Sequence, residues 1–279
     1  MPETTLANKA RKHARLIQKE LTKRTHPNRV ALQGSKQLIT EADGSFIRIV
    51  SVDKESPDRR KSRHIEYRES RLCAAQSQGA EQTYYEATFG NLEQVSLSWL
   101  QCCKDAGLAL NSEVHGVSDG AVWIEEQFRS IFKNSSTFLV DFYHVCEYLS
   151  AASNSCSKRP EQWLKTQRKR LKEGAYKKVI KCLSEHLENE HLDDQDAPVR
   201  RAHRYLSNRM DCLDYHLAIQ KNTPIGSGLI ESGHKHVIQA RMKIAGASWA
   251  MNTAEAFLQA RTLRANRKWD SYWNEKIAA

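Results

Sequence analysis

The sequence predicts a mixed α+β and α/β fold, in which a mixed five-stranded sheet with flanking helices is interrupted by an all-helical insertion. Three observations predict it. Residues 36–75 contain successive β-prone runs with no helical period between them, and residues 92–154 alternate helical and β-prone segments. Residues 155–222 are rich in Lys, Arg, Glu and Leu and poor in β-branched residues. Antiparallel strands followed by α/β alternation build a mixed sheet, and the third segment adds only helices.

Residues 1–35 form a basic N-terminal segment. A helix is predicted over residues 4–24, because one stripe is apolar and most other positions carry Lys or Arg. The stripe consists of Leu6, Ala10, Ala14, Ile17 and Leu21. Thr25-His26-Pro27 is expected to end the helix. Two interpretations stay open: a docking helix or basic arm, and a solvated amphipathic helix.

The first part of the core, residues 36–154, opens with strands. Residues 36–53 contain two β-prone runs that meet at Asp43-Gly44, so a hairpin with Asp43 in its turn is predicted. After a charged loop, a third antiparallel strand is predicted over residues 65–75, where charged and apolar residues alternate.

An α/β alternation completes this part of the core. After a helix over residues 92–106, a strand over 113–118 runs into Asp119. After another helix, a strand over 137–140 runs into Asp141. This chain order is that of the ribonuclease H-like fold. Groups at the carboxyl ends of strands in an open α/β sheet face the crevice where ligands bind.

The insertion, residues 155–222, is predicted to contain two or three helices, broken near Gly174 and over residues 193–198. Its basic residues form either a phosphate-binding face or a solvated helical face. Lys169 and Arg170 are the candidate DNA contacts on that face.

Residues 223–279 return to the core. A tight turn over residues 223–228 precedes a helix that carries Glu231 in its first turn, and His234 and Lys235 lie on adjoining positions of that helix. A basic amphipathic helix is predicted over residues 252–269. Trp249, between the two helices, is expected to be a core aromatic residue.

Three acids from distant segments stand out: Asp43, Asp119 and Glu231. Hard divalent cations need carboxylates gathered from separate elements, and Mg²⁺ is usually held by only a few of them together with water and phosphate oxygens. Two such ions about 3.5–4 Å apart can catalyse phosphoryl transfer. The alternative for each Asp is a turn-forming side chain, and for Glu231 a carboxylate that stabilises the start of a helix.

Composition points to a polyanionic partner. The 279 residues carry a formal net charge of +10, and the basic stretches lack the apolar face of a membrane-surface helix, so nucleic acid is favoured over a membrane. No apolar run reaches the length of about 18 residues that a membrane helix needs, and no secretory signal is expected. The seven cysteines show no zinc-ligand spacing, which is typical of buried thiols in a reducing cytoplasm.

Several short blocks resemble bacterial insertion-sequence transposases of the ISKra type, a branch related to the Mutator-like transposases. The blocks are EADGS, YRESRL, SDGAVWI, LVDFYHVCEYL, PIGSGLIES and RMKIAGASW. The resemblance as a whole runs from about Gln37 to Trp273. The resemblance implies a DDE transposase with a ribonuclease H-like core and a helical insertion between the second Asp and the final Glu.

The resemblance also implies roles for single residues. Asp43, Asp119 and Glu231 match the catalytic triad that holds Mg²⁺ or Mn²⁺. Asp141 and His144 match the D-x-x-H motif, in which the His assists at the transposon end or the scissile phosphate, and Asp141 is expected to support contact with DNA. We further expect Arg241 and Lys243 to contact phosphate.

The partners implied are the DNA of the terminal inverted repeats and of the target site. A homodimer on DNA, associated with the bacterial nucleoid in the cytoplasm, is expected.

Two alternatives remain. Such transposases usually carry an N-terminal DNA-recognition domain, and only about forty residues precede Asp43. A truncated, non-catalytic DNA-binding remnant that competes for transposon ends is therefore one alternative. The other is a nonspecific ribonuclease H-like nuclease, which would use the same acids without a preference for terminal repeats.

Overall fold

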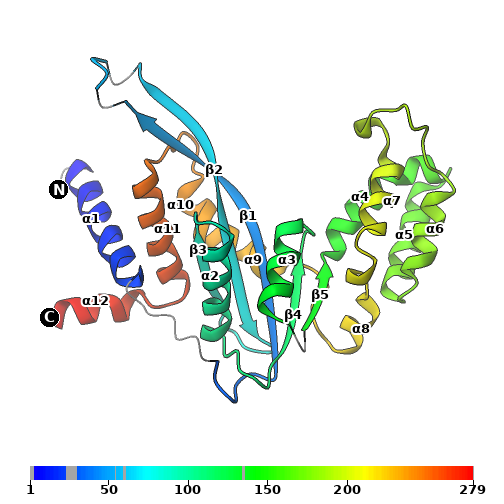
Figure 1. The fold of residues 1–279 in the computed structure, drawn as a ribbon, viewed down its shortest axis with the longest axis horizontal. Coiled ribbons are helices and arrows are strands. Elements are labelled where there is room, and N and C mark those ends of the chain that lie inside the picture. Colours follow the sequence, from blue (N-terminus) through cyan, green and yellow to red (C-terminus); the bar gives the residue numbers. More distant parts are fainter. Residues whose placement is uncertain (1–2, 23–29, 54, 59–60, 134–135, 279) are drawn as a thin grey trace. The chain divides into compact units, whose positions relative to one another are not determined.

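The computed structural model of the protein describes residues 3–22, 30–53, 55–58, 61–133 and 136–278. The chain divides into two compact units. The first combines Met1–Glu113 with Gly228–Ala279, and the second is Val114–Ser227. Figure 1 shows the elements of both.

The first unit is built on three antiparallel strands in the order β3-β2-β1. These are β1 (Gln37–Val52), β2 (Arg63–Ser77) and β3 (Tyr84–Thr88). The hairpin predicted at Asp43-Gly44 is wrong, because β1 runs straight through that dipeptide and pairs Asp43 with Leu72 and Gly44 with Arg71. The long pairing with β2 overrides the turn preference of Asp-Gly.

Gly44 leaves room in the strand for a neighbouring side chain and forms no turn. A Cβ built on Gly44 would lie 2.2 Å from Oε1 of Glu69, a residue of the neighbouring β2. The Glu69 side chain occupies this space and forms an ion pair of 2.6 Å with Arg71. A glycine inside a strand often marks such a close approach of a neighbouring group.

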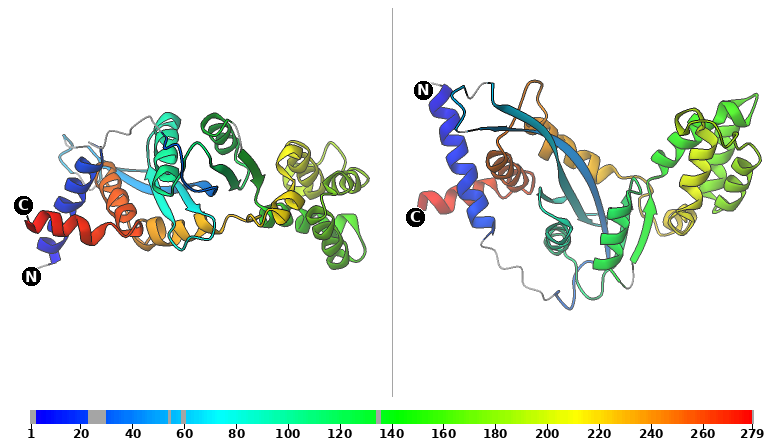
Figure 2. Two further views of the ribbon diagram at one scale, coloured as in Figure 1. Left: turned by 90° about the horizontal axis from the view of Figure 1, so that it is seen from below. Right: turned by 45° about the horizontal axis from the view of Figure 1, so that its top comes forward.

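Helices of the first unit pack against this sheet and against one another (Figures 1 and 2). They are α1 (Glu3–Thr22), α2 (Leu92–Asp105), α9 (Gly228–Gly233), the π-helical segment His234–Gln239, α10 (Ala240–Met242), α11 (Met251–Ala265) and α12 (Trp269–Ala278). The helices predicted over residues 4–24, 92–106 and 252–269 are confirmed within a few residues. The expected break at Thr25-His26-Pro27 lies outside the described residues.

Two apolar clusters hold the first unit together. Ile47 and Leu72 of the sheet pack with Val237, Ile238 and Leu258 from the helices that follow Gly228. Trp249 belongs to the same cluster, so the expectation of a core aromatic residue is confirmed. In a smaller cluster, Ile17 of α1 packs against Leu263 and Tyr272, which fixes α1 beside α11, as both views of Figure 2 show. The C-terminal part of the apolar stripe, Ala14, Ile17 and Leu21, therefore docks α1 on the protein, whereas Leu6 is exposed.

The second unit opens with a parallel strand pair and its helices. Strand β4 (Glu113–Ser118) pairs in parallel with β5 (Ser136–Val140), and α3 (Val122–Ile131) connects them. Helix α4 (Phe142–Cys156) follows β5. Both strands end directly before the aspartates that the sequence singled out, so these elements were predicted correctly.

The remainder of the second unit is entirely helical, as predicted. It contains α5 (Pro160–Lys172), α6 (Tyr176–Ser184), the 3₁₀ turn Asp194–Asp196, α7 (Pro198–Ser207), the 3₁₀ turn Met210–Cys212 and α8 (Tyr215–Gln220). The predicted break at Gly174 is confirmed, and its φ of +76° suits a residue without a side chain. The second predicted break coincides with the turns before α7.

The predicted mixed α/β fold with a five-stranded mixed sheet flanked by helices is confirmed. Its assignment to the ribonuclease H-like class stays a prediction. In the part of the chain that the structure describes, no helix is long and apolar enough to cross a bilayer. Six of the seven cysteines are buried and Cys182 is half-buried, and all are free thiols.

Candidate functional site

Two of the three predicted acids line one pocket of the first unit. Asp43 comes from β1 and Glu231 from α9, and the cavity between them has a volume of about 280 Å³. Its other lining residues are Gly44, Ser45, His234, Lys235 and Gln239. The Asp43 side chain is 37% exposed and Glu231 is exposed, so both carboxylates are open to solvent and to a ligand.

His234 fixes the orientation of the Asp43 carboxylate. Its Nε2 lies 2.8 Å from Oδ2 of Asp43, although the two residues are 191 positions apart in the chain. Because a carboxylate only accepts, the proton of this hydrogen bond is on Nε2. Oδ1 of Asp43 accepts the Gly44 N–H at 2.6 Å. Each oxygen thus keeps lone-pair capacity for a cation.

No role was predicted for His234, although its spacing from Glu231 was a signal that could have identified it. His234 follows Glu231 by three positions, so the two side chains lie on one face of the helix. The ring is buried, at 8% exposure, and within the described residues its Nδ1 has no hydrogen-bond partner. A buried imidazole bound to an acidic strand residue is the feature that distinguishes this pocket from an ordinary acidic surface.

Glu41 is a second acid of β1 that sequence reasoning missed. It is only 1% exposed, and its Oε2 accepts the backbone N–H of Ile230 at 2.8 Å. A carboxylate in this position satisfies one of the unpaired N–H groups in the first turn of α9. This hydrogen bond holds Ile230 against β1 and thereby determines the position of the adjacent Glu231.

The oxygen donors of Asp43 and Glu231 fit Mg²⁺ or Mn²⁺. Mg²⁺ is commonly held by one or two carboxylates, with waters and substrate phosphates completing its shell. Solvent-exposed carboxylates, one of them oriented by a second hydrogen bond, supply that donor set. Binding of Mg²⁺ or Mn²⁺ in this pocket stays a prediction.

A second cluster of possible metal ligands, in the second unit, is better explained by ion pairs. Ligand atoms of Glu125, Asp211 and Cys212 lie within 4.8 Å of one another, the one such group found among the described residues. Arg129 donates hydrogen bonds to the carboxylates of both Glu125 and Asp211. Burial raises the pKa of Cys212 to about 12, which keeps the thiol protonated. We therefore interpret the group as an ion-pair network.

Asp119 lies in the turn after β4, in the second unit, and is exposed. Its Oδ1 accepts the Ala121 N–H at 2.9 Å. Two side chains of the helical insertion hold the backbone of the turn: Tyr205 donates to the carbonyl of Asp119, and the guanidinium of Arg209 donates to the carbonyl of Gly120 at 2.7 and 3.0 Å. The insertion thus positions the second predicted acid.

Gly120 makes this arrangement possible. Its φ is +82°, a conformation that glycine adopts at little cost. A Cβ here would lie 2.7 Å from Nε of Arg209 and 2.9 Å from the Tyr205 hydroxyl. The Asp-Gly dipeptide, which forms no turn in β1, does form one here.

Asp141 has a structural role in the second unit. It is 4% exposed and caps α4, with Oδ1 accepting the N–H groups of Tyr143 and His144. Oδ2 accepts the N–H and the hydroxyl of Ser227, each at 2.6 Å. These four hydrogen bonds use the acceptor capacity of the carboxylate. This geometry offers no support for the predicted role of Asp141 in contact with DNA, which stays a prediction.

His144 stands in the first turn of α4 and lines a cavity of about 560 Å³ in the second unit. Its Nδ1 is 3.3 Å from Oε2 of Glu147, and its ring packs edge-on against Tyr148 and Tyr205. Tyr205 also binds the Asp119 carbonyl. His144 is therefore joined to the Asp119 turn through one tyrosine.

The four basic residues predicted to contact DNA lie on both units. Arg241 and Lys243 are exposed around the end of α10, and the guanidinium of Arg241 lies over the rings of Trp249 and Phe257. On α5, Lys169 is exposed and pairs with Glu173 at 3.7 Å, whereas Arg170 is half-buried and donates to Gln167. Contact with DNA by these residues stays a prediction.

A family model matches residues 98–276 of the chain, and its description is an uncharacterised protein family, UPF0236. The match covers more than half of the chain. The protein belongs to the UPF0236 family. The part that matches the UPF0236 model contains Asp119, His144 and Glu231, whereas Asp43 precedes it. No curated protein and no solved structure matches the chain.

Proposed function

We propose that this UPF0236 protein is a DDE transposase, which cleaves and transfers DNA strands at the ends of an insertion sequence with Mg²⁺ or Mn²⁺. The observation that carries the proposal is the pocket in which β1 and α9 bring together Asp43, Glu231 and His234. The resemblance of the sequence blocks to ISKra-type transposases and the net charge of +10 support DNA as the substrate.

Asp43 and Glu231 are the proposed metal ligands in the first unit. A divalent cation held there would activate the attacking oxygen and stabilise the leaving oxygen of a phosphodiester. His234 acts as a positioning residue, because its hydrogen bond fixes the Asp43 carboxylate. Glu41 positions α9, and hence Glu231, through the Ile230 N–H.

Asp119 is the third proposed ligand, and its assignment rests on the sequence. Its place at the carboxyl end of β4 supports the assignment, because ligand-binding groups of α/β sheets occur at such ends. Tyr205 and Arg209 act as positioning residues, since they hold both carbonyls of the Asp119-Gly120 turn. A rigid turn keeps a carboxylate ready for a metal with little loss of entropy on binding.

Strand cleavage by a Glu231→Gln variant tests the proposal. Wild type should nick a labelled duplex that carries the terminal repeat of the element in Mg²⁺ or Mn²⁺, and the variant should lose this activity because an amide is a weaker cation ligand than a carboxylate. Glu81→Gln is the matched control, because Glu81 is an exposed acid of the same unit outside the pocket. The control should cleave like wild type.

The same assay separates the alternatives. Absence of metal-dependent cleavage by wild type, with DNA binding retained, would contradict the proposal and favour a non-catalytic DNA-binding remnant. Equal cleavage of duplexes with and without the terminal repeat would instead favour a nonspecific nuclease.

A further inference from the structure

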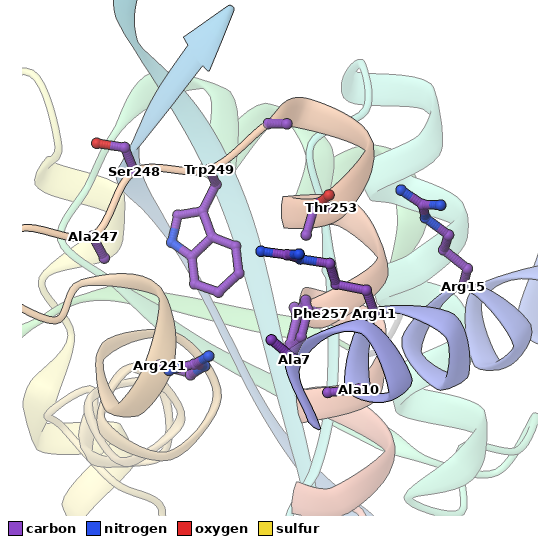
Figure 3. A pocket seen from close by; sticks show the side chains of 11 residues that line it. Ala7, Ala10, Arg11, Arg15, Arg241, Ala247, Ser248, Trp249, Thr253 and Phe257 are labelled. Carbon is purple, nitrogen blue, oxygen red and sulfur yellow. The ribbon is translucent and has the colours of Figure 1, made fainter. Parts of the chain in front are cut away.

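A second cavity of the first unit lies between α1 and the start of α11, and its volume is about 500 Å³ (Figure 3). Three arginines line it: Arg11 and Arg15 from α1, and Arg241 from α10. Trp249 and Phe257 provide aromatic surface, and small residues such as Ala7 and Ala10 leave the space open. The cavity contains neither Asp43 nor Glu231 and is therefore separate from the acidic pocket.

The arginines of this cavity are not neutralised. Arg11, Arg15 and Arg241 are exposed. Within the described residues, none of their guanidinium nitrogens lies within 4.0 Å of a carboxylate oxygen, so none of the three forms an ion pair. Nearby Arg261 has its pKa lowered by burial and by the positive charges of Arg264 and Arg241. Arg241 therefore stands close enough to other positive charges to interact unfavourably with them, and a bound anion would offset this repulsion.

Contacts with two aromatic rings hold the guanidinium of Arg241 in place. The centre of its guanidinium is 5.5 Å from the Trp249 ring and 5.7 Å from the Phe257 ring. Trp249 is itself fixed, since it is 8% exposed and its indole N–H donates to the Met242 carbonyl at 3.1 Å. Figure 3 shows Arg11 reaching from α1 toward the same indole. Guanidinium groups held in place in this way bind phosphate with less entropy loss than free ones.

We propose that this cavity is a binding site for the phosphodiester backbone of nucleic acid, and that α1 is docked on α11 to complete it. Guanidinium clusters suit phosphate oxygens, which accept two parallel N–H groups. A backbone, with its repeated phosphates, matches three separate guanidinium groups that come from two helices, whereas a small anion would occupy fewer of them. The inference rests on the proposed function only for the choice of DNA, and it requires neither metal nor catalysis.

DNA-binding affinity measured at several salt concentrations tests the site. A labelled duplex is titrated with full-length protein by fluorescence anisotropy in EDTA, where no cleavage occurs. Removing two phosphate contacts with Arg11→Gln and Arg15→Gln should weaken binding and reduce the slope of log affinity against log salt by about 2. The matched control is Lys9→Gln with Lys12→Gln, which removes the same charge from positions of α1 outside the cavity. Its slope should change by less.

Three results would overturn the inference. Equal loss in both double variants would mean that α1 attracts DNA only through its overall charge. Absence of DNA binding by wild type would exclude the site. Displacement of the duplex by millimolar inorganic phosphate at constant ionic strength would identify a small anion as the ligand. Because binding is measured in EDTA and cleavage in Mg²⁺ or Mn²⁺, a failure of cleavage and a failure of this site are distinguishable.

Discussion

The side chain of the single residue His115 connects β5 with the turn at Pro224 in the second unit. Its ring is buried in β4, where Nδ1 lies 2.8 Å from the Thr137 hydroxyl and Nε2 lies 2.8 Å from the Pro224 carbonyl. Burial lowers the pKa of His115, and this effect exceeds the opposing hydrogen bond to Pro224. The imidazole therefore stays neutral in the folded protein at pH values where an exposed histidine takes up a proton.

Acid should destabilise the protein through His115. The unfolded chain, with a histidine pKa of about 6.5, binds the proton first, so the free energy of unfolding should fall as pH drops below that value, by at most about 1.4 kcal/mol per pH unit, until the folded pKa is reached. Urea unfolding between pH 7.5 and 5 measures this. His115→Gln should flatten the profile, and the exposed His191→Gln should leave it steep. Identical profiles for wild type and His115→Gln would contradict the prediction.

Sequence reasoning found the exposed acids of the candidate sites but not the residues that support them. Asp119 and Glu231 were visible because each follows a recognisable strand or turn. Glu41 and His234 were assigned no role, because their importance depends on partners far away in the chain, Ile230 and Asp43 respectively. A hydrogen bond between such distant positions leaves no local pattern in the sequence.

At the scale of an element, β4 depends on a glycine against which aromatic rings pack. A Cβ on Gly116 would lie 2.4 Å from the Phe128 ring and 2.9 Å from the Phe138 ring. Phe128 in turn packs against Phe132 and Phe138, with ring centroids about 5 Å apart. The rings have nowhere to move, because Phe128 is 1% exposed. This cluster joins α3 to the strand pair directly behind Asp119.

Gly116→Ala should therefore destabilise the second unit. Overpacking of this kind costs about 1–3 kcal/mol of unfolding free energy, more than the entropy gained from replacing a glycine. Chemical denaturation followed by circular dichroism measures the loss. Gly228→Ala is the control, because no atom lies within 4 Å of its added Cβ, and it should be neutral or stabilising by up to about 1 kcal/mol. Equal stability of the two variants would show that the Phe128 and Phe138 rings can move to accommodate the added methyl group without loss of stability.

Elements with a clear hydrophobic period were predictable, and those set by long-range pairing were not. The spacing of apolar residues predicted α1, α2, α3 and α11 close to their observed bounds. The turn expected at Asp43-Gly44 failed because fifteen consecutive pairs from Leu38 to Val52 with β2 outweigh a two-residue preference. Strand β3 was missed because a five-residue segment carries too little pattern. The π-helical segment after Glu231 likewise has no signature in the sequence.

At the scale of the whole molecule, each of the two units contributes residues to the proposed chemistry. The first contributes Asp43 and Glu231, oriented by His234 and Glu41. The second contributes Asp119, whose turn is held by the helical insertion. The insertion is thus more than a basic surface, because Tyr205 and Arg209 bind the backbone of a proposed metal ligand. The N-terminal helix adds the arginines of the proposed phosphate site.

The central proposal is that Asp119 is required, as Asp43 and Glu231 are, for a metal-dependent reaction. Strand cleavage by Asp119→Asn in Mg²⁺ tests it most directly, because Asp119 is exposed and the substitution preserves the size of the side chain and its acceptor oxygen for the Ala121 N–H. We expect cleavage to fall to the background level of the protein without metal, while folding and DNA binding in EDTA stay as in wild type. Full cleavage by Asp119→Asn would show that Asp119 is not needed for the reaction.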